Sequence, residues 1–156
     1  MHLYFLRHGE ADWPNWEKSD DERPLTERGR KEMQKVADFL KLLDVSLDQI
    51  VTSPLPRAQQ TAQIVADRLK LKLREERALA PGFAISDLKL LRSQYPGKNI
   101  MLVGHEPDFS ETISALTGAS LKLSKAGLAL VEADESATSG KLLWLFPPKI
   151  ARKGAG

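Results

Sequence analysis

Residues 2–9 read HLYFLRHG, a largely apolar run that stops at an arginine, a histidine and a glycine. Residues 99–105, NIMLVGH, show a similar arrangement, with four apolar residues in succession before a glycine and a histidine. Short apolar runs of this kind are typical of strands that are covered on both faces, as in parallel sheets. The two stretches therefore predict buried strands that end at Arg7-His8 and at Gly104-His105.

Helical patterns follow the predicted strands. Thr26 is a suitable N-cap, and the apolar residues from Met33 to Leu43 keep the three- and four-residue spacing of one buried helix face. A second helix is expected to begin at Ser53-Pro54, because a cap residue followed by proline is typical of a helix start. The other predicted elements are strands at 49–52 and 71–74, helices at 86–95 and 107–118, and a hairpin of strands at 128–131 and 142–146.

This order of elements predicts an α/β fold. Alternating strands and helices favour a three-layer sandwich, in which a mainly parallel open sheet carries helices on both faces. The last two strands flank a turn-rich segment and are expected to add an antiparallel C-terminal hairpin. A chain of 156 residues is long enough for one core, so we expect a single domain over residues 1–148 and a tail over residues 149–156.

The composition excludes several classes of function. Lys and Arg number 23 against 21 Asp and Glu, and a formal net charge of +2 gives no reason to expect a nucleic acid or a membrane as partner. The absence of cysteine excludes disulfides, thiolate chemistry and Cys-ligated metals. No apolar run approaches the roughly 20 residues that span a bilayer. We expect a cytoplasmic enzyme, and the sequence leaves its oligomeric state open.

The polar residues at the strand ends predict a phosphate site. Ligands of open α/β sheets bind beyond the carboxyl ends of the strands. Arg7 and His8 follow the first strand, His105 follows the strand at 99–103, and Arg57 lies in the first turn of the helix after the strand at 49–52. Two arginine forks and a helix N-terminus suit a tetrahedral dianion. Each of these residues alone could have an ordinary structural role. Their joint placement at the strand ends is what favours a catalytic phosphate site.

Within such a site the two histidines take different roles. A neutral His8 imidazole aimed at phosphorus is a nucleophile, and the surrounding cations disfavour its protonated form. His105 can donate a hydrogen bond to the phosphoryl oxygens and stabilise charge as the bond breaks. The third histidine, His2, shows no such convergence and is expected to be an edge-strand residue.

Four motifs in register carry a resemblance to a known family. They are Arg7-His8-Gly9, Pro24-Leu25-Thr26 with Gly29, Ser53-Pro54-Leu55-Pro56-Arg57-Ala58 with Thr61-Ala62, and Gly104-His105, with a weaker match at Ala126-Gly127. Together they resemble the histidine phosphatase superfamily, which has the phosphoglycerate mutase-like fold and includes phosphoglycerate mutases and acid phosphatases. The resemblance implies that His8 is transiently phosphorylated, that Arg7, Arg57 and His105 bind the phosphoryl group, and that no cofactor or metal takes part.

The length of the chain indicates which branch of the superfamily it resembles most. Only 47 residues, 58–104, separate Arg57 from His105, which leaves no room for the long insertion of the mutases. The chain most resembles the short bacterial SixA-like phosphohistidine phosphatases, which act on phosphorelay or phosphotransfer proteins. Glu106 departs from that branch and stands where some acid phosphatases keep a catalytic proton donor. Its alternative interpretation is a first-turn helix residue placed favourably against the helix dipole.

Three functions remain open from the sequence. The first is a phosphatase that cleaves the P–N bond of phosphohistidine on a protein, and the second is a small-molecule phosphomonoesterase or mutase that uses the same pocket. The third is a phosphate-binding module without turnover, which has no need of a neutral imidazole behind the phosphate. Trp13 and Trp16, in the polar loop over residues 11–25, either dock a partner protein or pack that loop down.

Overall fold

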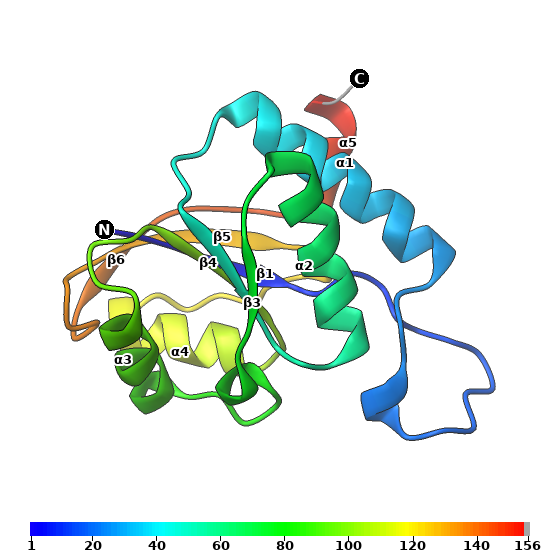
Figure 1. Ribbon diagram of the computed structural model, residues 1–156, viewed down its shortest axis with the longest axis horizontal. Coiled ribbons are helices and arrows are strands. Elements are labelled where there is room, and N and C mark those ends of the chain that lie inside the picture. Colours follow the sequence, from blue (N-terminus) through cyan, green and yellow to red (C-terminus); the bar gives the residue numbers. More distant parts are fainter. Residues whose placement is uncertain (155–156) are drawn as a thin grey trace.

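One six-stranded sheet organises the computed structural model, which describes residues 1–154 (Figure 1). Its strand order is β3-β2-β4-β1-β5-β6. The elements are β1 (His2–Arg7), η1 (Asp20–Glu22), α1 (Glu27–Leu43), β2 (Gln49–Thr52), α2 (Pro56–Leu69), β3 (Leu73–Glu75), η2 (Arg77–Leu79), α3 (Ile85–Gln94), β4 (Ile100–Gly104), α4 (Asp108–Thr117), β5 (Leu128–Ala133), β6 (Gly140–Phe146) and α5 (Pro148–Gly154).

The sheet is parallel over its first four strands and antiparallel over its last two. β1 pairs with β4, and β2 pairs with both β4 and β3, all in parallel. β5 runs antiparallel to β1, and β6 runs antiparallel to β5. The predicted α/β fold with a C-terminal antiparallel hairpin is confirmed. The register sets Arg7 opposite Gly104, so the carboxyl ends of the two central strands lie level with one another.

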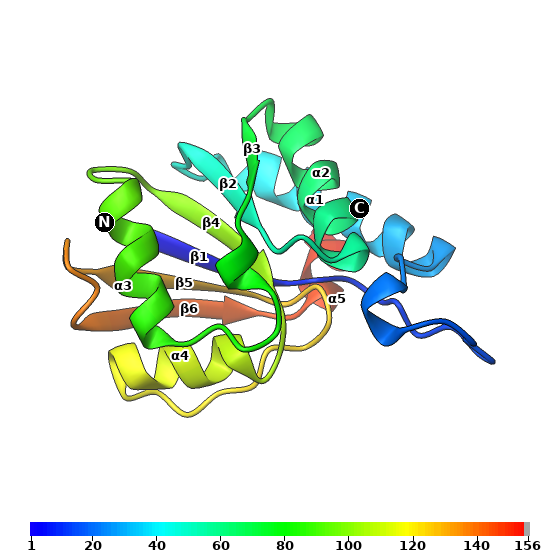
Figure 2. The same ribbon diagram turned by 60° about the horizontal axis from the view of Figure 1, so that its bottom comes forward.

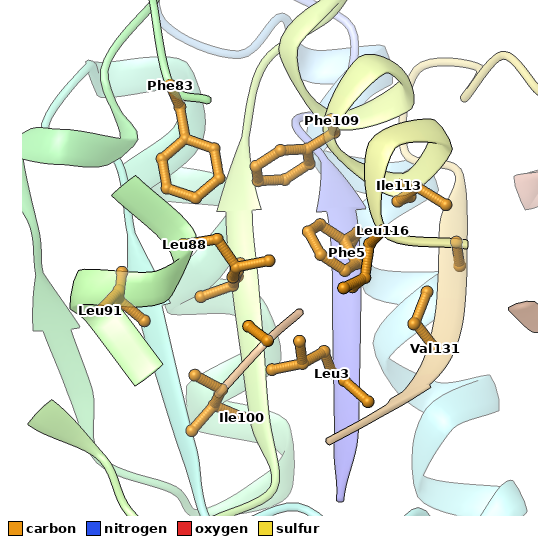
Figure 3. Close-up of a cluster of buried hydrophobic side chains, with 14 of the residues drawn as sticks. Leu3, Phe5, Phe83, Leu88, Leu91, Ile100, Phe109, Ile113, Leu116 and Val131 are labelled. Carbon is orange, nitrogen blue, oxygen red and sulfur yellow. The ribbon is translucent and has the colours of Figure 1, made fainter. Parts of the chain in front are cut away.

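Alternate residues of the central strand serve two separate cores. Leu3 and Phe5 lie in a cluster with side chains of α3 and α4, whereas Tyr4 and Leu6 lie in a cluster with side chains of α1, α2 and α5. Figure 2 shows the two sets of helices on opposite sides of the sheet, and Figure 3 shows Leu3 and Phe5 among the side chains of the first cluster. The three-layer sandwich is therefore also confirmed.

The helices α1 and α2 begin with different kinds of N-cap. Thr26 is the N-cap of α1 as predicted, and its hydroxyl accepts a hydrogen bond from the Gly29 amide at 3.0 Å. The predicted start of α2 at Ser53-Pro54 is wrong, because Pro56 takes the first position and Leu55 is the N-cap. The Ser53 hydroxyl instead forms a hydrogen bond with Nε2 of His105.

The expectation of a tail after residue 148 is also wrong for the part that the structure describes. Residues 148–154 form the short helix α5, which packs on α1, and Ala151 is fully buried. Residues 155 and 156 of the predicted tail lie outside the described residues. Within residues 1–154, no helix is both long and apolar enough to cross a membrane.

Candidate active site

Two histidines meet at the carboxyl ends of the central strands. The His8 amide donates to the Gly104 carbonyl at 3.1 Å, which joins the chain after β1 to the end of β4. The rings of His8 and His105 lie with their centroids 5.3 Å apart. Arg57, in the first turn of α2, and Arg7, at the end of β1, are both close enough to influence the His8 ring electrostatically. The structure thus brings together the four residues that the sequence placed in a phosphate site.

The His8 ring is held in one tautomer. Its Nδ1 lies 2.7 Å from the carbonyl oxygen of Gly9, and a carbonyl oxygen only accepts, so Nδ1 carries the proton and donates it. In the neutral ring the lone pair is then on Nε2. Burial is the largest cause that lowers the pKa of His8 to about 4; the Gly9 bond opposes it, and the positive charges of Arg57, Arg7 and Arg23 add to it. At neutral pH the ring is therefore uncharged.

His105 is buried beside it, with only 4% of its surface exposed. Its Nε2 lies 2.7 Å from the Ser53 hydroxyl, which also accepts a hydrogen bond from the Leu55 amide. Burial, together with the neighbouring His8, Arg57 and Arg7, lowers the pKa of His105 to about 3. Its Nδ1 is buried and has no partner within the described residues. That nitrogen is the atom with which His105 can reach a ligand.

The two predicted arginines are each anchored through one nitrogen. Arg7 Nη1 donates to the Leu123 carbonyl at 3.0 Å, and Arg57 Nη1 donates to the Asp20 carbonyl at 2.8 Å. Arg57 is only 7% exposed, so it is not the surface residue that its helix position alone suggests. Each guanidinium is therefore oriented by one bond, with its other N–H groups left for an anion.

A third arginine lies in the same place, and sequence reasoning missed it. Arg23 Nη1 donates to the Ala11 carbonyl at 2.7 Å, and its Nε lies 3.5 Å from the Asp20 carboxylate without hydrogen-bond geometry. Its charge helps to lower the pKa of both His8 and Arg57. The one feature of the sequence that could have pointed to Arg23 is its position directly before the Pro24-Leu25-Thr26 motif. Its position in a long polar loop gave no sign that it lies close to His8 and Arg57.

Unpaired nitrogens gather at this point of the molecule. Among the side chains of residues 1–151, seven buried nitrogen or oxygen atoms have no hydrogen-bond partner. Four of the seven belong to Arg7, Arg23, Arg57 and His105. Buried polar groups are rarely left without partners, because each one costs about 1–3 kcal/mol. Three guanidinium groups and an imidazole with unused nitrogens form a site that matches a tetrahedral oxyanion.

The motif residues that carry no charge hold the nucleophile loop in place. The Gly9 amide donates to Thr61 Oγ1 at 3.0 Å, and that hydroxyl donates to the Arg57 carbonyl at 2.7 Å, which ties the loop after β1 to α2. A Cβ on Gly29 would overlap the backbone of Glu10, so only glycine lets α1 start this close to the loop. A Cβ on Gly104 would come within 2.7 Å of the Phe109 ring.

Glu106 lies beside the site and is held by the first turn of α4. Its two carboxylate oxygens accept hydrogen bonds from the Ser110 amide at 2.8 Å and from the Ser110 hydroxyl at 2.6 Å. Glu106 and Arg7 line one hollow of about 450 Å³, together with residues of α4 and of the segment that follows it. The structure therefore places Glu106 beside the same hollow as Arg7 and also at the N-terminus of α4.

The two tryptophans belong to the loop between β1 and α1, which extends away from the sheet at the lower right of Figure 1. Trp13 Nε1 donates to the Pro24 carbonyl at 2.8 Å, and Trp16 Nε1 donates to the Ser19 carbonyl at 3.0 Å. Both indole N–H groups are thus used within the loop, which supports the interpretation that they pack it down. Docking of a partner there stays a prediction.

A metal site was not expected. Among the described residues, no three His, Cys, Asp or Glu side chains gather closely enough to hold a metal ion. The positive charges that act on both His8 and His105 are those of Arg7 and Arg57, with Arg23 acting on His8 as well.

Comparison with known proteins decides the family. The model of the histidine phosphatase superfamily (branch 1) matches residues 3–80. The chain belongs to the histidine phosphatase superfamily. Its members are phosphatases and mutases, so phosphoryl-group chemistry is the class of activity that the match supports. The match contains His8, Arg23 and Arg57, whereas His105 lies beyond it.

Relatives within the superfamily include short, SixA-like proteins. An uncharacterized protein of Picosynechococcus sp. (strain ATCC 27264 / PCC 7002 / PR-6) is 35% identical over 96% of this chain and 98% of its own length. Phosphohistidine phosphatase SixA of Escherichia coli (strain K12) is 38% identical over 46% of this chain and 43% of its own length.

A solved structure extends the likeness to almost the whole chain. The protein histidine phosphatase SixA complexed with tungstate has a TM-score of 0.84 and 28% identity, and the match covers 96% of this chain and 99% of that one. The chain is a SixA-like member of the histidine phosphatase superfamily.

Proposed function

We propose that this protein is a phosphohistidine phosphatase, which removes phosphate from a histidine of a signalling or phosphotransfer protein. The observation that carries the proposal is the set of unpaired buried nitrogens on Arg7, Arg23, Arg57 and His105 around a neutral His8. Such a set binds a phosphoryl group and leaves an imidazole lone pair to attack it. A module that only binds phosphate has no need of that imidazole.

The first chemical step transfers the phosphoryl group to His8. Nε2 of His8 attacks phosphorus, and the P–N bond of the substrate breaks with its electron pair passing to the leaving nitrogen. A substrate imidazole that is protonated on its other nitrogen leaves as a neutral ring. The guanidinium groups of Arg7, Arg23 and Arg57 neutralise the phosphoryl oxygens, and positioned donors of this kind stabilise the transition state.

The second step restores the enzyme. Water attacks phospho-His8, the P–N bond to Nε2 breaks, and inorganic phosphate is released. Nδ1 stays bonded to the Gly9 carbonyl through both steps, which keeps Nε2 aimed at phosphorus. If the Ser53 hydroxyl donates to Nε2 of His105, the proton of neutral His105 is on Nδ1 and faces the phosphoryl oxygens as a donor. No step requires a metal or a cofactor.

Two observations support a P–N bond rather than an ester as the substrate. An alkoxide leaving group needs a proton donor, whereas an imidazole leaves without one. The carboxylate of Glu106, the one candidate donor from the sequence, has both oxygens occupied by Ser110. The 47 residues between Arg57 and His105 form the rest of α2, then β3, η2, α3 and β4 with their short connections, so none remain for a long insertion over the site. An open site suits a protein-borne phosphohistidine.

A second candidate is a small-molecule phosphomonoesterase, or a mutase, that uses the same pocket. The hollow shared by Arg7 and Glu106 favours it, because a carboxyl group beside a bound phosphate can serve as proton donor to an ester. In that case Glu106 would take a catalytic role in addition to His8 and His105.

Turnover of matched substrates separates the two candidates. We expect kcat/KM for a phosphotransfer domain carrying phosphohistidine to exceed that for phosphoserine or an alkyl phosphate by about a hundredfold or more. His8→Ala should abolish turnover of all of them, and His2→Ala, which changes the remaining histidine, should abolish none. A wild-type enzyme that hydrolyses small esters far better than the phosphohistidine domain would establish the second candidate instead.

A further inference from the structure

A continuous series of hydrogen bonds joins Glu106 to the phosphate-binding Arg7. The Ser110 amide and hydroxyl donate to the two oxygens of Glu106, at 2.8 and 2.6 Å. The same hydroxyl accepts the amide of Leu123 at 3.1 Å. The carbonyl of Leu123, in turn, accepts Arg7 Nη1 at 3.0 Å. Each group in the series therefore has its donor or acceptor role fixed by the next.

The link passes through a segment that has no helix or strand of its own. Residues 118–127 connect α4 to β5 without regular backbone pairing. Leu123 is fully buried in the core beneath α3 and α4, and both of its backbone polar groups are used by the series. A backbone carbonyl in an irregular segment is oriented only by such contacts. Ser110 thus determines where the acceptor for Arg7 lies.

We propose that Glu106 and Ser110 are positioning residues that orient the Arg7 guanidinium through the backbone of Leu123. Glu106 holds the Ser110 hydroxyl in the rotamer that accepts from Leu123, and Leu123 holds Arg7 at the angle that presents its remaining N–H groups to the phosphoryl oxygens. Glu106 then acts on the reaction through Arg7 and is not its proton donor. Only the kinetic part of this inference rests on the proposed function, because oxyanion binding is measured without turnover.

A double-mutant cycle on tungstate binding tests the link. By calorimetry, Ser110→Ala should weaken tungstate binding about tenfold in the wild-type background and less than twofold in an Arg7→Ala background. Ser110→Thr, which keeps a hydroxyl, should restore most of the affinity. Ser114→Ala, an exposed change on the same helix, is the matched control and should have no effect. An equal loss in both Arg7 backgrounds would overturn the proposal.

Glu106→Gln provides the same test without a buried cavity. It keeps the shape of the side chain but offers one acceptor oxygen to two donors, so tungstate binding should weaken about threefold, again only where Arg7 is present. No change in affinity would contradict a positioning role even if Ser110→Ala failed to fold.

Kinetics then distinguish positioning from proton donation. Loss of orientation at Arg7 affects every phosphoryl group alike, so Glu106→Gln should lower kcat/KM by the same factor for a phosphohistidine domain and for phosphoserine. A loss confined to the ester would make Glu106 its proton donor and overturn the proposal. If the wild type hydrolyses no phosphohistidine, the proposed function fails, while the tungstate cycle still decides the role of Glu106 and Ser110.

Discussion

The neutral state of His8 depends on burial more than on any single neighbour. Burial is the largest cause of its lowered pKa, and the charges of Arg57, Arg7 and Arg23 act in the same direction. The hydrogen bond to the Gly9 carbonyl favours the protonated ring and is outweighed. In the proposed mechanism, His8 therefore needs no separate base to become a nucleophile at neutral pH. The same arrangement makes the fold sensitive to acid.

The lowered histidine pKa values predict how stability changes with pH. His8 titrates at about 4 and His105 at about 3 in the folded chain, against about 6.5 when unfolded. Between these values the unfolded state binds more protons, so the free energy of unfolding should fall as the pH drops from about 6.5 towards 4. Denaturant titrations at pH 7 and pH 5 measure this fall. It should be smaller in His8→Gln, and an equal fall would contradict the burial of a neutral ring.

Arg57→Ala tests the phosphate-binding role at a single side chain. Removal of a positioned donor to the transition state commonly costs roughly 3 kcal/mol, so kcat/KM should fall about a hundredfold or more. The fold should lose only the bond to Asp20, which contributes roughly 1 kcal/mol, and the melting temperature reports that change. Arg68→Ala, an exposed arginine of the same helix that pairs with Asp38, should leave turnover unchanged. Near-normal turnover of Arg57→Ala would make Arg57 structural.

At the scale of elements, regular patterns were predicted well and long-range contacts were not. The strand at 49–52 and the cap at Thr26 follow from local preference and have the expected bounds. The start of α2 was misjudged because Ser53 is bonded to His105, 52 positions away. The helix α5 was missed because it packs on α1, a contact that no local pattern reveals. Arg23 was missed for the same reason.

The close approach of α1 to the nucleophile loop yields a test of the element that holds it. A Cβ at position 29 would overlap the Glu10 backbone, so Gly29→Ala must displace the start of α1 or the loop after His8. Overpacking of this kind typically costs about 1–3 kcal/mol. We expect the free energy of unfolding to fall by that amount and kcat to fall with it. Arg30→Ala, an exposed change one residue later, is the control, and equal stability of both variants would contradict the argument.

At the scale of the whole molecule, arginine side chains gather at the carboxyl ends of the central strands. Parallel pairing brings the ends of β1 and β4 level, and α2 and the loop after β1 supply the remaining arginines. A net charge of +2 over 156 residues conceals this local excess of cations. The sequence could predict the strand ends, because parallel strands end on the same side. It could not predict that the loop over residues 11–25 brings Arg23 close enough to act on His8 electrostatically.

Charge neutralisation by arginine predicts independence from metals. Within residues 1–154 no cluster of three candidate metal ligands exists, and three guanidinium groups lie at the phosphate site. Dialysis against EDTA should therefore leave kcat/KM of the full chain unchanged. Activity that disappears on dialysis and returns with a divalent ion would contradict the proposed arrangement of the site.

The central claim is that His8 becomes phosphorylated during turnover, and rapid quenching tests it most directly. The full chain is mixed with a phosphotransfer domain that carries radiolabelled phosphohistidine, and the reaction is stopped in base, where a P–N bond survives. Wild-type enzyme and His2→Ala should carry label that is stable to base and labile to acid, and peptide mapping should place it on residue 8. His8→Ala should carry none. Label of the same stability on His8→Ala, or on another residue of the wild type, would contradict the account.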